Sequence, residues 1–383
     1  MKQAVMIGAG QIGRGFIGML LEKAGYHVVF ADVNMDVVND INTRGEYTVH
    51  LMDTVCEETV VKNISAMHVA SPELVEAIAQ PECDLICTSV GLTALTKVAP
   101  VIASGLSLRR RNGVEEPMNI IACENAIRGT SQLKAMVEEH LAEEDLAWLP
   151  AHTGFPDSAV DRIIPPRHDV SAAESYVERY HEWDVERGGF IGEIPEVEGM
   201  EVVDDLTAYL ERKLFTLNGP NAVTACMGYE RNYPTINETL KDPEVYAVVW
   251  GMMEECCAML VKRHGFSPES LEQYRKNLMQ RFMNPYIIDD CVRVAREPIR
   301  KLSPQDRIIA PMMHAHEYGI PTPSYYTGVA SVLLYANPEE PQCMEIQKML
   351  SEGGVRRVME QVCDVHEDDI IDAIEKEYER LKG

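Results

Sequence analysis

The feature that most constrains the fold lies near the N-terminus, where an apolar segment, three glycines and a helical pattern follow one another. Residues 4–7 (Ala-Val-Met-Ile) predict a buried strand, and residues 8–13 (Gly-Ala-Gly-Gln-Ile-Gly) follow it directly, ahead of an apolar-periodic helix. A second predicted strand, residues 27–31, ends in Asp32, nineteen positions after Gly13. This order of strand, GxGxxG turn, helix, strand and acid predicts a dinucleotide-binding α/β unit.

Each glycine of the turn has its own physical task. Gly8 permits the tight turn, Gly10 lets the backbone approach a pyrophosphate, and Gly13 lets helix and strand pack closely. Asp32 is placed to accept hydrogen bonds from the adenosine ribose and to repel a 2′-phosphate, so NAD is expected rather than NADP. The cofactor-binding residues predicted in the turn are Gly8, Ala9, Gly10, Gln11, Ile12 and Gly13.

Two further strand-like runs continue the βαβ rhythm of a doubly wound sheet. They cover residues 84–88 and 119–123. Because ligands bind beyond the carboxyl ends of parallel strands, the loops at residues 89–91 and 124–125 are candidate site loops. The cofactor contacts predicted in the first of these loops are Val90 and Gly91.

From about residue 204 the pattern changes to long helical segments with few strand signals. Helices are predicted over residues 206–217, 246–261, 271–282, 304–318 and 354–381. The fold class is therefore α/β, with a Rossmann-type, doubly wound sheet domain followed by a mainly α-helical domain. We expect the NAD-binding domain to cover residues 1–195 and the helical substrate domain residues 196–383, with the active site in the cleft between them.

Composition limits the partners of this chain. Its 35 lysines and arginines against 61 acids give a formal charge of −26, which disfavours nucleic acid and anionic membranes as partners. No apolar run approaches the roughly 20 residues that span a bilayer. The ten cysteines form no CxxC pair, and the N-terminus lacks a signal-peptide pattern, so a cytoplasmic protein is expected.

Two segments of the second half carry candidate chemistry. On a 3.6-residue helix Lys213, Asn218 and Asn221 fall within a sector of about 140°, so one lysine and two amides would share a face. The alternative is a solvated lysine beside the helix-ending Gly219-Pro220. The second segment, residues 293–307, holds five basic residues in fifteen and suits an anionic small substrate, or else forms a charged face paired with neighbouring acids. Its basic residues are Arg293, Arg296, Arg300, Lys301 and Arg307.

In these motifs the chain resembles the polyol-specific long-chain dehydrogenase/reductase family from end to end. The resemblance rests on blocks in the same order and at near-matching spacing. These blocks are residues 8–18, 30–34, 121–125, 157–166, 211–218 and 284–307.

The resemblance implies reversible, metal-independent hydride transfer between the nicotinamide of NAD and a sugar carbon. The implied pair is fructose 6-phosphate and mannitol 1-phosphate, and the implied state is a monomer. The family's catalytic lysine matches Lys213, and its oxyanion-binding asparagines match Asn125 and Asn218. Its substrate contacts match Asp161, Arg293 and Lys301, with Arg300 beside them.

One position departs from the family pattern K-x4-N-x2-H, because Asn221 stands where the histidine is expected. Asparagine donates hydrogen bonds to a hydroxyl but does not titrate near neutrality. Two alternatives therefore stay open: a related NAD-dependent reductase of hexuronates (tagaturonate or fructuronate) or ketoses, and a catalytically weakened NADH-binding relative.

Overall fold

The computed structural model describes residues 2–53, 56–164, 171 and 174–383, divided into two units, Met1–Leu206 and Thr207–Gly383. The division lies eleven residues beyond the expected boundary at residue 195. Its cause is strand β12 (Glu201–Val203), which pairs in parallel with β11 (Glu182–Glu186). This pairing ties residues 201–203 to the sheets of the first unit.

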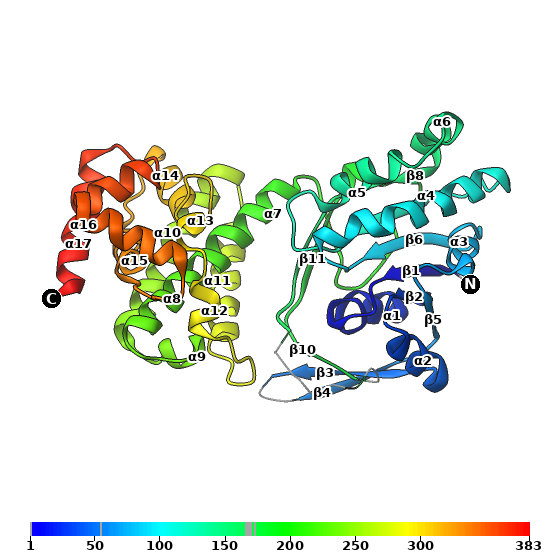
Figure 1. Cartoon of the computed structure of the whole chain (residues 1–383), viewed down its shortest axis with the longest axis horizontal. Coiled ribbons are helices and arrows are strands. Elements are labelled where there is room, and N and C mark those ends of the chain that lie inside the picture. Colours follow the sequence, from blue (N-terminus) through cyan, green and yellow to red (C-terminus); the bar gives the residue numbers. More distant parts are fainter. Residues whose placement is uncertain (1, 54–55, 165–170, 172–173) are drawn as a thin grey trace. The chain divides into compact units, whose positions relative to one another are not determined.

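A six-stranded parallel sheet lies at the centre of the first unit (Figure 1). Its strand order is β5-β2-β1-β6-β7-β8, so the chain reverses direction across the sheet between β1 and β6. In a doubly wound sheet this switch point is where ligands bind. The strands are β1 (Gln3–Ile7), β2 (His27–Asp32), β5 (Ile64–His68), β6 (Cys83–Thr88), β7 (Met118–Ala122) and β8 (Thr153–Gly154).

Both faces of this sheet are buried. Along β1, Ala4 and Met6 belong to one apolar cluster while Val5 and Ile7 belong to the other. The period of two and the continuous apolar run are what a parallel sheet covered on both sides requires. The predicted Rossmann-type fold class of the N-terminal domain is thereby confirmed. The helices of this unit are α1 (Met19–Lys23), α2 (Met35–Arg44), α3 (Pro72–Ile78), α4 (Leu95–Arg111), α5 (Gly129–Glu138) and α6 (Glu143–His152), with a π-helix, η1 (Gly13–Gly18), ahead of α1.

Two three-stranded sheets of the first unit were not predicted from the sequence. One has the order β10-β3-β4, and the other the order β12-β11-β9. Their strands are short and come from distant parts of the chain, so no single segment carries a strong signal. The strands not yet given are β3 (Tyr47–Met52), β4 (Glu57–Val61), β9 (Ser158–Asp161) and β10 (Glu174–Glu178).

The second unit is helical over the residues that the structure describes, which confirms the predicted mainly α-helical C-terminal domain. Helices α8, α10 and α15 pack on one another at its centre. The elements of this unit are α7 (Leu206–Arg212), the π-helix η4 (Lys213–Asn218), α8 (Gly219–Glu230), α9 (Ile236–Thr239), α10 (Pro243–His264), α11 (Pro268–Phe282), α12 (Cys291–Ala295), α13 (Pro298–Lys301), α14 (Ile309–Glu317), α15 (Pro323–Leu334), α16 (Pro341–Gln361) and α17 (Asp368–Lys382).

Two predicted helices of this unit were wrong in extent. The segment predicted as helical over 304–318 is helical from Ile309 only, because residues 303–308 form turns. The segment predicted over 354–381 is two helices, α16 and α17, with Gly354 at a φ of 70° inside the first. A positive φ is available to glycine at little cost, which explains the kink at this position.

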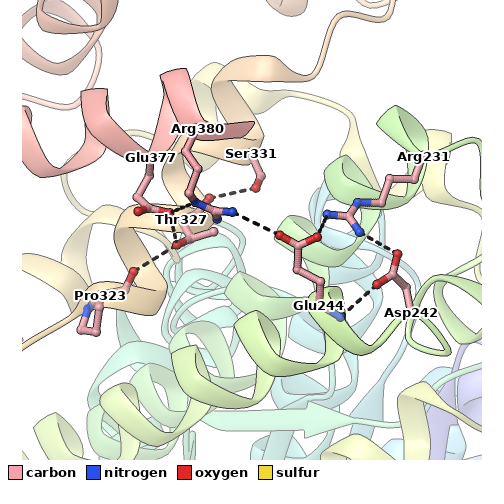
Figure 2. Close-up of polar contacts among 8 residues, drawn as sticks. All are labelled: Arg231, Asp242, Glu244, Pro323, Thr327, Ser331, Glu377 and Arg380. Atoms are coloured by element: carbon pink, nitrogen blue, oxygen red, sulfur yellow. Dashed lines mark hydrogen bonds and ion pairs between the residues drawn. The ribbon is translucent and has the colours of Figure 1, made fainter. Parts of the chain in front are cut away.

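A polar network fastens α17 to the rest of the second unit (Figure 2). Arg231, at the end of α8, donates to Asp242 at 2.6 Å and to Glu244 at 2.7 Å. Arg380 of α17 reaches the same Glu244 at 3.3 Å and Glu377 at 2.9 Å. Asp242 also caps α10, because its side chain accepts from the Glu244 N–H.

Candidate active site

The glycine-rich turn after β1 is shaped by close backbone contacts. Gly8 has a φ of 101°, and a Cβ there would lie 2.5 Å from the Ser89 carbonyl oxygen. A Cβ on Gly13 would lie 1.9 Å from the Gly8 carbonyl oxygen. Gly10 is exposed, and a Cβ there would meet no atom within 4 Å. The turn is therefore tight on the protein side and open at Gly10, which is where a pyrophosphate would need to approach the backbone.

Asp32 ties this turn to the end of β2. Its Oδ2 accepts from the Ala9 N–H at 2.7 Å, and its Oδ1 accepts from the Asn34 N–H at 2.8 Å. Each carboxylate oxygen has a second lone pair, so Asp32 can still accept hydrogen bonds from ribose hydroxyls.

Two other residues of the turn direct their side chains into the protein. The Oε1 of Gln11 accepts from the Ser175 hydroxyl at 2.6 Å and from the Tyr176 N–H at 3.1 Å, both on β10. Ile12 packs against the apolar cluster on one face of the sheet. Both side chains remain partly exposed.

A buried carboxylate holds the loop at residues 89–91. Glu124 is 5% exposed and accepts from the N–H groups of Val90 at 2.9 Å and of Gly91 at 2.8 Å. It also accepts from the Thr88 hydroxyl at 3.0 Å. Sequence reasoning placed Glu124 in a site loop but missed this role. The available signal was an acid after strand β7 and a glycine after the adjacent strand β6.

The two remaining candidates of the first unit lie in different surroundings. Asn125 directly follows Glu124 and is exposed, at the carboxyl end of β7. Asp161 is 8% exposed and is the last residue of β9, where it pairs with Glu182 of β11. The first unit thus gathers the turn at 8–13, Asp32 and the loops at 89–91 and 124–125 at one edge of the sheet.

In the second unit Lys213 and Asn218 are the first and last residues of the π-helix η4. The expected α-helix would have placed them about 140° apart. A π-turn closes between residues five apart, so it brings both side chains toward the same face, and such turns are frequent at functional sites. Asn221 follows in α8, and its Oδ1 is buried with no hydrogen-bond partner among the described residues.

Neighbouring elements hold η4 in this conformation. Inside the turn, the Thr216 hydroxyl lies 3.4 Å from the Cys256 sulfur of α10, and both residues are fully buried. At its end, a Cβ on Gly219 would lie 2.3 Å from the Arg307 carbonyl oxygen. The last residue of the basic segment, Arg307, therefore packs directly against the end of the Lys213–Asn218 turn.

Acids accompany several side chains of the basic segment. Arg293 pairs with Asp289, Arg300 pairs with Glu297 at 2.8 Å, and Arg307 pairs with Asp306 at 2.6 Å. Arg300 also lies 3.6 Å from Asp306. Arg293 and Arg300 remain 59% and 47% exposed at the side chain, so both can still bind an anion from solvent.

Lys301 differs from its neighbours because it is 7% exposed. Its Nζ donates to the carbonyl oxygens of Val294 and Arg296, which are two residues apart at the carboxyl end of α12. Burial lowers the pKa of Lys301 to about 8. Two of the three ammonium donors thus support the local backbone.

Among the described residues no group of three or more His, Cys, Asp or Glu side chains is arranged to hold a metal ion. Within the same residues no helix combines the length and apolar character that crossing a membrane demands.

Comparisons with known proteins match both halves of the chain. The family model of the mannitol dehydrogenase Rossmann domain matches residues 2–199, and that of the mannitol dehydrogenase C-terminal domain matches residues 205–382. A solved structure of Pseudomonas fluorescens mannitol 2-dehydrogenase, in ternary complex with NAD and D-mannitol, is 18% identical with a TM-score of 0.72, covering 100% of this chain and 92% of that one. A substrate-free D-sorbitol dehydrogenase is 16% identical with a TM-score of 0.84, covering 100% and 93%. At these identities the two structures establish a shared fold.

Proposed function

The chain belongs to the mannitol dehydrogenase family, and from this premise we propose that it is an NAD-dependent oxidoreductase that interconverts D-mannitol 1-phosphate and D-fructose 6-phosphate. The coarse activity, oxidation of a polyol CH–OH group and its reverse, accords with the family. The phosphate on the substrate and the residue roles are the finer parts of the proposal.

NAD fits the edge of the sheet in the first unit. The opening at Gly10 is the space that a side chain would fill, and the carboxylate of Asp32 retains lone pairs for a ribose. The N–H groups at the start of the first helical turn favour the negative charge of a pyrophosphate. The residues proposed to hold NAD are Gly8, Ala9, Gly10, Gln11, Ile12, Gly13, Asp32, Val90 and Gly91.

Bound NAD supplies the hydride acceptor in oxidation and, as NADH, the hydride donor in reduction. Lys213, in its neutral form, takes the hydroxyl proton of the polyol, and in its protonated form it returns a proton to the ketose. Asn125 and Asn218 donate amide hydrogen bonds to the alkoxide that develops on the reacting carbon. Asn221 and Asp161 hydrogen-bond further substrate hydroxyls.

The observation that carries the phosphate assignment is the contact of Gly219 with the Arg307 carbonyl. This contact brings Arg307, the last residue of the basic segment, against Gly219, directly after the turn that bears Lys213 and Asn218, and it supports a basic segment near that turn. A substrate with an anion at one end and a secondary alcohol further along would suit this arrangement, because guanidinium groups anchor phosphate while the alcohol meets the lysine. Arg293, Arg300 and Lys301 are the proposed anion contacts.

The test is NADH oxidation at neutral pH with fructose 6-phosphate, beside fructose, fructuronate and tagaturonate, with NADPH as the cofactor control. We expect turnover with fructose 6-phosphate and NADH alone. Turnover of a uronate instead would replace the phosphate assignment with a carboxylate one. Tight NADH binding without turnover of any of the four would make the chain a catalytically weakened relative.

The lysine assignment is tested by Lys213→Ala. We expect a loss of kcat of about 10²–10⁴, the range for a missing general acid–base, with NADH affinity retained. Tryptophan-to-NADH energy transfer gives the affinity in the same samples. A K213A variant that keeps more than a tenth of the wild-type kcat would contradict the role.

A further inference from the structure

Arg212, directly before Lys213, lies among three aromatic rings. Its guanidinium carbon is 4.6 Å from the ring centre of Tyr209, 4.5 Å from that of Tyr274 and 5.5 Å from that of Phe266. The rings of Tyr209 and Phe266 also meet edge to face at 5.4 Å. We call these three residues the aromatic box. They come from α7, from α11 and from the connection between α10 and α11, so the box joins the end of α7 to two other elements.

The residue before Arg212 is anchored to the same region by charge. Glu211 accepts two hydrogen bonds from Arg263, at 2.7 and 3.0 Å, and one from His264 at 2.6 Å. Burial acts to raise the pKa of Glu211, but the hydrogen bonds from Arg263 and His264 outweigh it and lower that pKa. Glu211, through its ion pairs, and Arg212, through the aromatic box, thus anchor the two residues directly before η4.

A π-turn needs such support. Its i→i+5 pattern is rare in isolation and persists where surrounding structure holds it. Inside the turn Thr216 packs against Cys256, and after the turn Gly219 packs against the Arg307 carbonyl. Before the turn, the corresponding supports are Glu211 and Arg212. Lys213 is the first residue of the turn, and its four-carbon side chain is flexible. The position of its Cα and the direction of its Cα–Cβ bond therefore depend on Glu211 and Arg212.

Resting on the proposed function, we infer that Arg212 in its aromatic box is a positioning residue for the proton-transferring Lys213. Arg212 acts through the backbone of η4 and not by touching the substrate. Its planar guanidinium stacks on aromatic faces, whereas a lysine at the same position would carry the charge without the stacking plane. A small misplacement of a catalytic group, of about 1 Å, can cost about 10²-fold in rate.

The test compares variants that change the box in different ways. Arg212→Met removes the charge and the plane, Arg212→Lys keeps only the charge, and Phe266→Leu keeps the arginine but removes one ring face. We expect kcat to fall about tenfold to a hundredfold in R212M, by a smaller factor in R212K, and about threefold to tenfold in F266L, with KM for NADH unchanged. Tyr274→Phe, which keeps the ring and removes only the hydroxyl, should keep kcat within twofold.

The chain offers a matched control in a second cation–π pair of the same unit. Arg275 lies 4.0 Å from the ring centre of Trp250, and neither residue is adjacent to η4 in the sequence. Trp250→Leu should lower the melting temperature at least as much as F266L while leaving kcat at the wild-type value. A merely structural role for the box would lower stability in both variants and leave kcat per folded molecule intact in both.

The outcomes separate this inference from the function on which it rests. If K213A is inactive but R212M and F266L keep wild-type kcat, the positioning role is wrong and the lysine assignment holds. If K213A is active, the lysine assignment itself fails, and with it the premise for Arg212. If W250L loses kcat as R212M does, the effect is general to the unit and the positioning role is wrong.

Discussion

The two units build their candidate site residues in opposite ways. In the first unit the site is made of backbone: glycines too close to carbonyl oxygens for any side chain, and two N–H groups held by Glu124. In the second unit it is made of side chains on one π-turn, between Lys213 and Asn218. The charges differ as well, because residues 1–206 carry 15 basic and 34 acidic residues, a net −19, and residues 207–383 carry 20 and 27, a net −7. At the tightly packed glycines of the backbone site, an added side-chain atom collides with the protein. At the side-chain site, added atoms can be accommodated, but function depends on the orientation of the side chains.

The largest expected effect comes from adding one methyl group to the backbone site. Gly13→Ala would place a Cβ 1.9 Å from the Gly8 carbonyl oxygen, so turn and helix must separate. We expect the variant to lose measurable NADH binding and to unfold at a melting temperature lower by several degrees. NADH fluorescence titration and thermal unfolding measure both quantities.

Gly10→Ala is the matched control for this change. Its Cβ meets no atom of the protein within 4 Å, so the fold should keep its melting temperature. NADH affinity should still fall, by about tenfold or more, because the methyl group occupies the space that the pyrophosphate needs. Equal NADH affinity in G10A and the wild type would show that the cofactor does not approach the backbone at Gly10.

The side-chain site is tested next, by Asn218→Ala. Loss of one donor to a developing alkoxide typically costs about 10²–10³ in kcat, and we expect a loss in this range with NADH affinity unchanged. Steady-state kinetics with fructose 6-phosphate and NADH measures it. A fall in NADH affinity with kcat preserved would reassign Asn218 from the reaction to the cofactor.

The sequence predicted the backbone site more completely than the side-chain site, for a physical reason. The spacing of Gly8, Gly10 and Gly13 follows from steric requirements within a few residues, so it can be recognised in the sequence alone. The contact of Glu124 with Val90 and Gly91 joins residues more than thirty apart, and only the strand order brings them together. The two small sheets escaped prediction for the same reason.

In the second unit Lys213 and Asn218 were predicted on one face of a helix, but the type of helix was not predicted. Lys213 and Asn218 were expected on an α-helix, and the π-turn that brings them toward one face depends on tertiary contacts such as Thr216 with Cys256. The basic segment was expected to be either an anion site or a charged face paired with neighbouring acids. The structure pairs Arg293 and Arg300 with neighbouring acids and buries Lys301, details that charge counting along the chain does not contain.

A smaller effect is expected from loosening the loop in the first unit. Glu124→Ala leaves the N–H groups of Val90 and Gly91 and the Thr88 hydroxyl without their acceptor. We expect NADH to bind about threefold to tenfold more weakly, because the loop must be ordered again on binding. Titration of E124A and the isosteric E124Q distinguishes shape from charge, and unchanged affinity in E124A would remove Glu124 from the cofactor site.

The smallest effect lies outside both sites, in the network that fastens α17. Arg231→Met removes the ion pairs of Arg231 with Asp242 and Glu244 and should cost about 1 kcal/mol of unfolding free energy, as partly exposed ion pairs do. For a unit of this size that corresponds to a melting temperature lower by about 2–4 °C, with kcat unchanged. A change in kcat would instead couple this network to the Lys213–Asn218 turn.

The pH dependence of that small effect has a definite sign. For Asp242, burial acts to raise the pKa, but hydrogen bonds, first that from Arg231, lower it below its usual 3.8; for Glu244, the hydrogen bond from Arg231 is the main cause of a pKa below its usual 4.5. Carboxyl groups whose pKa is lower in the folded state stabilise it above their unfolded values and lose that contribution as the pH falls through the folded ones. The difference in melting temperature between wild type and R231M should therefore be constant from pH 8 to about 5 and shrink as the pH falls below about 4. A difference that stays constant as the pH falls through 4 would mean that Arg231 stabilises the unit through packing of its side chain and not through these two carboxylates.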